Sequence, residues 1–315
     1  MENSENIICI SSIDWDFIWQ GHQEIMATFA KNGNRVLFIE NTGVRVPGIR
    51  DTLRLKKRLM NWLKGIKGFR GISENLYVYS PLVLPFPYSR VARWINKNFL
   101  LASLRKWVRI MNFRDTIIWT FLPTGTALDI IDEFDYKCLI YYCIADFYEL
   151  ANTERVQKTE NALIKKADGI FAQAKSLDEK CRNLNANVYI FPFGVNINIF
   201  DAARSTLNKT DYNDISKIKK PIIGYIGGIH RHIDFNLLRY IAKSNPNWSL
   251  VLIGPIQVDI SGLKEVPNIL FLGQKDFRLL PGYIKEFDVC IIPYVKNEYT
   301  DTVYPTKLNE YHILG

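Results

Sequence analysis

The sequence predicts an α/β protein built from two Rossmann-like domains of parallel sheet that face a crevice. Short apolar segments alternate with segments of helical periodicity along most of the 315 residues. The apolar segments are hydrophobic nearly throughout, which is typical of parallel strands covered on both faces. A polar segment at 201–220 interrupts the alternation, which then restarts at Pro221. We therefore expect an N-terminal domain at 1–200, a linker at 201–220 and a C-terminal domain at 221–315.

The elements of the first domain follow from these two patterns. Strands are expected at 6–12, 35–40, 115–121, 137–144, 169–172 and 188–192, and helices at 23–31, 52–66, 91–111, 126–134, 156–167 and 176–183. The loop 12–22 follows the first strand and is expected to line the crevice, so Trp15 and His22 are candidates for contact with an acceptor or a membrane. No Gly-x-Gly-x-x-Gly fingerprint follows that strand, so Glu40 alone does not indicate a dinucleotide.

Two segments of the first domain form a basic block. Between Arg50 and Arg114 there are 15 Lys and Arg against two acidic residues, whereas the whole chain carries a net charge of only +8. The predicted helix 52–66 is cationic with one apolar stripe, and Arg58 and Trp62 are its candidates for membrane contact. The predicted helix 91–111 also combines Trp with Lys and Arg, and it has the alternative of an ordinary core-facing helix. No nucleic-acid-binding motif accompanies the charge, so we favour an anionic membrane surface and expect no nucleic acid.

Composition excludes several classes of protein. With 48% hydrophobic and 23% charged residues, the chain is neither disordered nor fibrous. Its five cysteines lack metal-ligand spacing and are expected to be reduced thiols of a cytoplasmic protein. The first residues lack the features of a signal peptide, and no apolar run is long enough to span a bilayer. We therefore expect a cytoplasmic protein that is neither exported nor transmembrane.

The C-terminal segment carries the clearest candidate site. Strands are expected at 221–228, 249–254, 268–273 and 288–294, and helices at 235–243, at 277–286 and from Pro305 onward. Pro305 suits the first position of a helix, whose free N–H groups suit a phosphate. Lys307 in the first turn could neutralise phosphate, and Glu310, one turn on, could accept ribose hydroxyls. The alternative is that Lys307 and Glu310 form an i,i+3 surface ion pair.

Six segments, in the same order along 138–315, resemble those of GT-B glycosyltransferases of the retaining "group 1" type, which build bacterial surface polysaccharides. One is Phe191-Pro-Phe-Gly-Val-Asn-Ile-Asn-Ile-Phe200, which is similar to the family's Pro-Asn-Gly-Val-Asp-x-x-x-Phe element. The others are Ala167-Asp-Gly-Ile-Phe-Ala-Gln-Ala-Lys-Ser-Leu177, Ile223-Gly-Tyr-Ile-Gly-Gly228, Val251-Leu-Ile-Gly254, Asn268-Ile-Leu-Phe-Leu-Gly273 and Pro305-Thr-Lys-Leu-Asn-Glu-Tyr311. The match over residues 1–137 is weaker. The resemblance implies a nucleotide-sugar donor in the C-terminal half and an acceptor in the N-terminal half.

The resemblance also implies roles for individual residues. Glu310 would bind the donor ribose, and Gly227 and Gly228 would contact the phosphates, which backbone can approach closely at glycine. The remaining donor candidates are Lys307 and the backbone of Tyr304, Pro305 and Thr306 for the diphosphate, Gly273 and Gln274 for the base, and Arg231 and Lys175 as further cations. No metal is obligatory, because the helix N-terminus, the glycine loop and Lys307 can offset the diphosphate charge.

Asp146 is the candidate catalytic residue. It follows the strand 137–144, where many members of the family place a His or an acid. It could stabilise the positive charge that develops on the sugar or orient the acceptor hydroxyl, and its alternative role is a helix N-cap. Two departures accompany the resemblance. Thr302 stands where the family has its first acid, and the chain ends at Gly315 where members of the family continue, so we expect an incomplete second domain.

Together these observations predict a glycosyltransferase that is cytoplasmic and peripheral to the inner face of the cell membrane. It would move a sugar from a nucleotide diphosphate donor to a lipid-linked or saccharide acceptor, and the resemblance implies retention of configuration at the sugar. Two alternatives stay open. One is a catalytically inactive, membrane-associated binding partner of a polysaccharide assembly. The other is a nucleotide-sugar epimerase, which would convert its donor without an acceptor.

Overall fold

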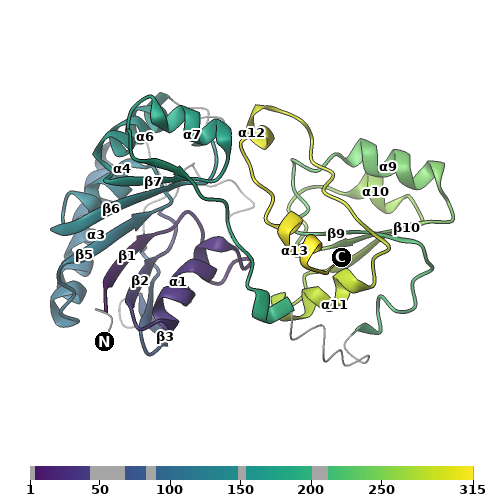
Figure 1. Cartoon of the computed structure of the whole chain (residues 1–315), viewed down its shortest axis with the longest axis horizontal. Helices are drawn as coiled ribbons and strands as arrows, with labels where there is room; N and C mark the ends of the chain where they lie inside the picture. The colour runs from purple at the N-terminus through teal and green to yellow at the C-terminus, as the bar shows by residue number, and fades with distance from the viewer. Residues whose placement is uncertain (1–3, 43–67, 83–89, 148–153, 201–211, 315) are drawn as a thin grey trace. The chain divides into compact units, whose positions relative to one another are not determined.

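The structure is a computed structural model that describes residues 4–42, 68–82, 90–147, 154–200 and 212–314 (Figure 1). The chain divides into two compact units, Met1–Pro192 and Phe193–Gly315. This division lies before the predicted linker at 201–220. Tyr212 and Ile215, which fall within that predicted linker, are buried in the core of the second unit, so this part of the segment belongs to a folded domain.

The first unit contains an eight-stranded sheet with the order β3-β4-β2-β1-β5-β6-β7-β8. All neighbouring strands are parallel except β3 and β4, which pair antiparallel at the edge. The strands are β1 (Asn6–Ile10), β2 (Arg35–Ile39), β3 (Phe69–Ser73), β4 (Leu76–Tyr79), β5 (Thr116–Thr120), β6 (Tyr136–Cys143), β7 (Gly169–Ala172) and β8 (Val188–Ile190). The described helices of this unit are α1 (Gly21–Lys31), α3 (Arg90–Ile110), α4 (Gly125–Ile131), α6 (Glu154–Lys166) and α7 (Lys175–Arg182).

The main core of this unit lies between the sheet and four of its helices. Leu104 of α3, Ile130 of α4, Leu163 of α6 and Leu177 of α7 are all buried in one cluster with the strands. Alternate strand residues such as Ile8 belong to this cluster, because successive side chains of a strand point to opposite faces. The near-continuous apolar strands of the sequence therefore correspond to central strands covered by helices, as predicted.

The hairpin of β3 and β4 was not among the predicted elements. It lies in the basic block, where the spacing of apolar residues among the cations predicted only helices. The segment Leu76-Tyr-Val-Tyr79 pairs with β2, and Leu76 and Val78 are buried. Aromatic and β-branched residues in this short run are a strand signal that the surrounding cationic pattern concealed. The predicted helix 52–66, with Arg58 and Trp62, lies outside the described residues.

The second unit contains a four-stranded parallel sheet with the order β11-β10-β9-β12. Its strands are β9 (Ile222–Ile226), β10 (Ser249–Ile253), β11 (Ile269–Gly273) and β12 (Val289–Cys290). The helices of this unit that lie wholly within the described residues include α9 (Phe235–Ser244), α10 (Ser261–Lys264), the 3-10 helix η3 (Phe277–Leu279), α11 (Leu280–Lys285), α12 (Glu298–Asp301) and α13 (Lys307–Leu314). Figure 1 shows α9 and α10 on one side of this sheet and α11 and α13 on the other, and a separate apolar cluster fills each side.

Two predicted boundaries in this unit differ from the structure. The strand predicted at 288–294 is only Val289–Cys290, because β12 lies at the edge of the sheet and pairs with β9 alone. The helix predicted from Pro305 begins at Lys307, so Pro305 precedes the helix instead of opening it. Among the described residues, no helix is both long enough and apolar enough to cross a bilayer.

Candidate functional site

The glycine loops that follow β9 and β10 pack directly against each other. Gly227 and Gly254 both have a φ of +148°, a backbone conformation that residues with a side chain rarely adopt. A Cβ atom on Gly254 would lie 1.9 Å from the carbonyl oxygen of Gly227. A Cβ atom on Gly227 would lie 3.0 Å from Cε of Lys307. Only glycine therefore allows the two loops and the Lys307 side chain to meet at the carboxyl edge of this sheet.

The ammonium group of Lys307 is held beside this loop by two tyrosines. Its Nζ donates a hydrogen bond to Oη of Tyr294 at 2.7 Å. It also lies 5.0 Å from the centre of the Tyr294 ring and 5.4 Å from that of Tyr225, within the range of cation–π attraction. The hydroxyl of Tyr225 in turn donates to the carbonyl oxygen of Gly228 at 3.0 Å. These contacts position one positive charge next to the glycine loop.

His230 shows that the surroundings of the loop disfavour further positive charge. Its pKa is lowered to about 4, first by burial and then by His232, Lys307 and Arg231. The imidazole is therefore neutral near pH 7, and it lies 6.0 Å from the ring of Tyr294. A partly buried place where several groups raise the positive potential favours an anion such as a diphosphate.

Glu310 lies one turn beyond Lys307 on α13. Burial raises the pKa of its carboxyl group, and the nearby Lys307 opposes that rise. The Lys307 ammonium contacts Tyr294, and within the described residues no ion pair of 4.0 Å or less joins it to Glu310. The helix is anchored by Tyr311, whose buried hydroxyl accepts a hydrogen bond from the N–H of Ile226 at the end of β9, at 3.0 Å.

The other predicted donor residues lie around the same unit. Gly273 has a φ of +70°, and its carbonyl oxygen accepts from the N–H of Gly254 at 2.9 Å, so the loop after β11 joins the two glycine loops. Gln274 and Arg231 are exposed. The segment Tyr304-Pro305-Thr306 leads into α13, and the carbonyl oxygens of Pro305 and Thr306 accept hydrogen bonds from the first N–H groups of this helix. The hydroxyl of Tyr304 donates to the side-chain oxygen of Asn309 at 2.7 Å.

The sequence patterns did not identify Tyr225 and Tyr294 as site residues. Both tyrosines belong to apolar runs, which were interpreted only as strands of the core. The available signal was their place near the carboxyl ends of adjacent parallel strands, where ligands bind in open α/β sheets. Gln257 was missed as well, and its Nε2 would lie 3.0 Å from a Cβ atom on Gly228.

Asp146 lies in the first unit, just after β6, and is partly exposed within a cluster of three charged side chains. The ammonium of Lys180 on α7 lies 3.1 Å from Oδ1 of Asp146 and 2.7 Å from Oε2 of Glu160 on α6. Glu160 is fully buried and also accepts from the hydroxyl of Tyr141 at 2.8 Å. Burial raises the pKa of Glu160, whereas Lys180 lowers it. Residues 148–153 lie outside the described residues, so the alternative role of Asp146 as a helix N-cap stays a prediction.

The remaining candidates occupy different environments. Trp15 is buried, with its ring edge-on to Trp19 and Phe38. His22 is buried as well, its Nε2 lies 2.9 Å from Oγ of Ser12, and burial lowers its pKa to about 3. The structure thus places Trp15 and His22 in the interior instead of on a surface that could meet a membrane. Lys175 is exposed and pairs with Glu179 on its own helix.

The geometry of the second unit suits a nucleoside diphosphate. The glycine loops give close backbone approach, and Lys307 gives positive charge. The N–H groups of Leu308, Asn309 and Glu310 already donate to the carbonyl oxygens of Pro305 and Thr306. The Glu310 carboxylate lies one turn further, where it could accept hydroxyl groups. Across the described ranges, no group of three His, Cys, Asp or Glu side chains is arranged to hold a metal ion.

Comparison with known proteins supports the fold and gives one distant relative. No protein-family model matches the chain. Over 224 residues the chain is 25% identical to a Bacillus subtilis (strain 168) protein named "Putative teichuronic acid biosynthesis glycosyltransferase TuaH". That match covers 69% of this chain and 51% of the relative, so the chain spans about half the length of the relative it matches.

Two solved structures are similar to most of the chain. The sucrose-phosphate synthase of Thermosynechococcus elongatus superposes with a TM-score of 0.65 at 15% identity, over 92% of this chain and 76% of that one. HepE of Anabaena, in complex with UDP and glucose, superposes with a TM-score of 0.63 at 10% identity, over 98% of this chain and 78% of that one. The GT-B glycosyltransferase fold predicted from the sequence is therefore confirmed.

Proposed function

We propose that this chain is a glycosyltransferase that moves a sugar from a nucleotide diphosphate donor to a lipid-linked or saccharide acceptor. The observation that carries the proposal is the place of the Lys307 ammonium against the Gly227 and Gly228 loop, with Glu310 one turn away. A diphosphate and its ribose require these groups at about this spacing. The relative named for teichuronic acid biosynthesis and the UDP complex of HepE support the same reaction class.

The donor would be held without an obligatory metal. The leaving diphosphate gains negative charge as the glycosidic bond to the sugar breaks, and fixed positive groups lower the energy of that state. Lys307 supplies a full charge, and the glycine loop lets the backbone approach the diphosphate closely. Tyr294 keeps the ammonium in place before the donor arrives, so little reorganisation is needed.

Asp146 is the proposed catalytic carboxylate. It would stabilise positive charge on the sugar or orient the acceptor hydroxyl, with retention of configuration at the sugar. Lys180 lies between Asp146 and the buried Glu160, so it holds Asp146 at a fixed place. The proposed setting is the cytoplasmic face of the cell membrane, during synthesis of a surface polysaccharide.

A transfer assay tests this proposal. The chain is incubated with UDP-, GDP- or dTDP-sugars and a membrane lipid extract, and release of nucleoside diphosphate is measured. We expect release with at least one donor, loss of release in Glu310→Ala, and unchanged release in the control His312→Ala, which alters an exposed residue of the same helix. The absence of release with every donor, alongside intact nucleotide binding, would favour the inactive binding partner. Conversion of the donor sugar without any acceptor would favour the epimerase.

A further inference from the structure

The helix α3 exposes an apolar stripe on the side that faces away from its core. Its inward residues, including Leu100 and Leu104, are buried against the sheet. Its outward residues include Val91 at 68% exposure, Trp94 at 67%, Phe99 at 51% and Ile95 at 41%. Single exposed apolar side chains are ordinary, but a contiguous patch of large ones marks a surface that binds something.

The same outward side becomes cationic further along the helix. Arg105, Lys106 and Arg109 are all exposed. At about 100° per residue, the apolar stripe and these cations fall within an arc of about 140° of the helix. The helix therefore presents an apolar half followed by a basic half on a single face, and its opposite face is fixed in the core.

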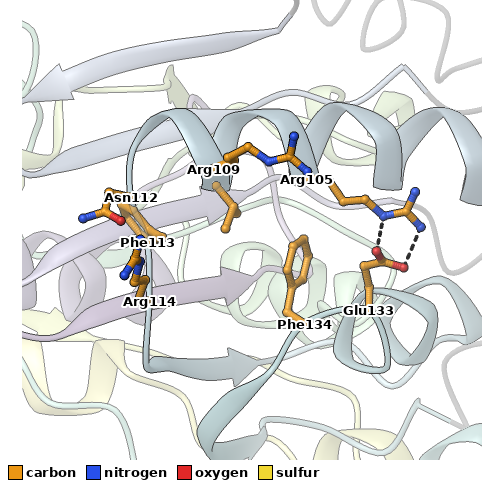
Figure 2. Close-up of a pocket in the computed structure, with 8 residues that line it drawn as sticks. Arg105, Arg109, Asn112, Phe113, Arg114, Glu133 and Phe134 are labelled. Atoms are coloured by element: carbon orange, nitrogen blue, oxygen red, sulfur yellow. Dashed lines mark hydrogen bonds and ion pairs between the residues drawn. The ribbon is translucent and has the colours of Figure 1, made fainter.

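The basic half ends at an open cavity of about 250 Å³. Arg105, Arg109 and Arg114 line it together with Phe113 and Phe134. Figure 2 shows Arg105 and Arg109 extending along α3 on one side of the cavity, with Phe134 on the other. The guanidinium of Arg105 forms a two-point ion pair with Glu133, which leaves Arg109 and Arg114 as the further cationic groups of the lining.

We propose that this face of α3 docks on an anionic lipid bilayer. Val91, Trp94, Ile95 and Phe99 would enter the interfacial layer, where the amphipathic ring of Trp is favoured. Lys106 and Arg109, with the cavity beside them, would contact lipid phosphates. Charge complementarity selects this partner, because the exposed charges of the face are basic while the adjoining stripe is apolar and aromatic. The proposal deepens the proposed function, since it names the surface by which the chain would reach a lipid-linked acceptor.

Vesicle binding by the purified full chain tests the proposal. The chain is mixed with vesicles of phosphatidylcholine alone or of phosphatidylcholine with phosphatidylglycerol, and the bound fraction is measured by sedimentation over a range of salt concentrations. We expect binding to the anionic vesicles that weakens as salt increases, and little binding to the neutral ones. Lys106→Gln with Arg109→Gln should weaken binding by about fivefold per charge removed. Trp94→Ser should weaken it by about tenfold or more.

Matched variants on α9 provide the control. Tyr240 of that helix is 70% exposed and Lys243 is exposed as well, so Tyr240→Ser with Lys243→Gln removes comparable groups from another helix and should leave vesicle binding unchanged. Circular dichroism melting confirms that each variant folds. Equal binding to neutral and anionic vesicles, or unchanged binding by the α3 variants, would overturn the proposal. The proposal would also be overturned if Trp94→Ser dissociates a dimer, as measured by light scattering, and the variant still binds vesicles as the unaltered chain does. No donor is present, so this result is independent of the transfer assay.

Discussion

Replacing Lys307 with methionine removes one charge and one hydrogen-bond donor while keeping a long apolar side chain. Its ammonium is the group that the structure places against the glycine loop, within 2.7 Å of Oη of Tyr294. A hydrogen bond between charged partners contributes about 1.5–3 kcal/mol. Loss of that contact to a diphosphate therefore corresponds to a dissociation constant about 10- to 150-fold larger. Uridine lacks the diphosphate, so its affinity should change much less.

Isothermal titration with UDP and with uridine measures both effects. The matched control is Lys264→Met, which removes an exposed lysine from the end of α10. The variant also has a second expected signature. Because Lys307 contributes to the lowered pKa of His230, Lys307→Met should raise that pKa from about 4, as followed by NMR titration of the imidazole. Equal weakening of UDP and uridine, or unchanged UDP affinity, would refute the assignment of Lys307 to the diphosphate.

Three further predictions follow from the described residues. Tyr294→Phe removes the hydroxyl that accepts the hydrogen bond from Lys307. It should weaken UDP binding by roughly two- to tenfold in titration calorimetry and leave the denaturation midpoint nearly unchanged. A large loss of stability would instead mean that the hydroxyl stabilises the fold. Gly254→Ala should lower the free energy of unfolding, measured in urea, by about 2 kcal/mol or more, because its Cβ would lie 1.9 Å from a backbone oxygen. The control Gly33→Ala also has a positive φ but no atom within 4 Å of its Cβ, so it should lower this free energy less. Equal losses would show that the backbone strain of a positive φ, and not the contact, determines the effect. Burial lowers the pKa of His22 in the folded state to about 3, below its ordinary 6.5. Protonation of the unfolded chain should therefore lower the free energy of unfolding as pH falls below 6.5, by about 2 kcal/mol at pH 5. His22→Gln should flatten that part of the pH profile, and an identical slope in both proteins would contradict this effect of burial.

The alternation of strands and helices along the chain was predictable, because central parallel strands are covered on both faces and are therefore apolar nearly throughout. The strands around β1 and β9 were located from this signal alone. The hairpin of β3 and β4 was missed, since its short strands lie in a segment whose charge indicated helices. The edge strand β12 was predicted too long, because an apolar run ending in Pro293 does not determine how many of its residues pair with a neighbouring strand.

Side-chain contacts within the candidate sites were less predictable. Lys307 and Glu310 could be singled out because they are neighbours on one helix, so their spacing is fixed by local geometry. The cluster of Asp146, Glu160 and Lys180 joins a loop and two helices, and only the tertiary packing brings these charges together. Trp15 was expected near a surface because its segment looks like a loop, yet its ring packs between other aromatic rings.

The most direct test of the donor site is an equilibrium titration of the full chain with UDP, GDP and dTDP, repeated for Glu310→Ala and His312→Ala. We expect that at least one nucleotide binds and that Glu310→Ala weakens its binding by about tenfold or more, because the ribose hydroxyls lose a charged acceptor. His312→Ala, which changes an exposed side chain of the same helix, should bind as the unaltered chain does. Binding of none of the three nucleotides, or equal affinity in Glu310→Ala, would show that the donor site is wrongly assigned.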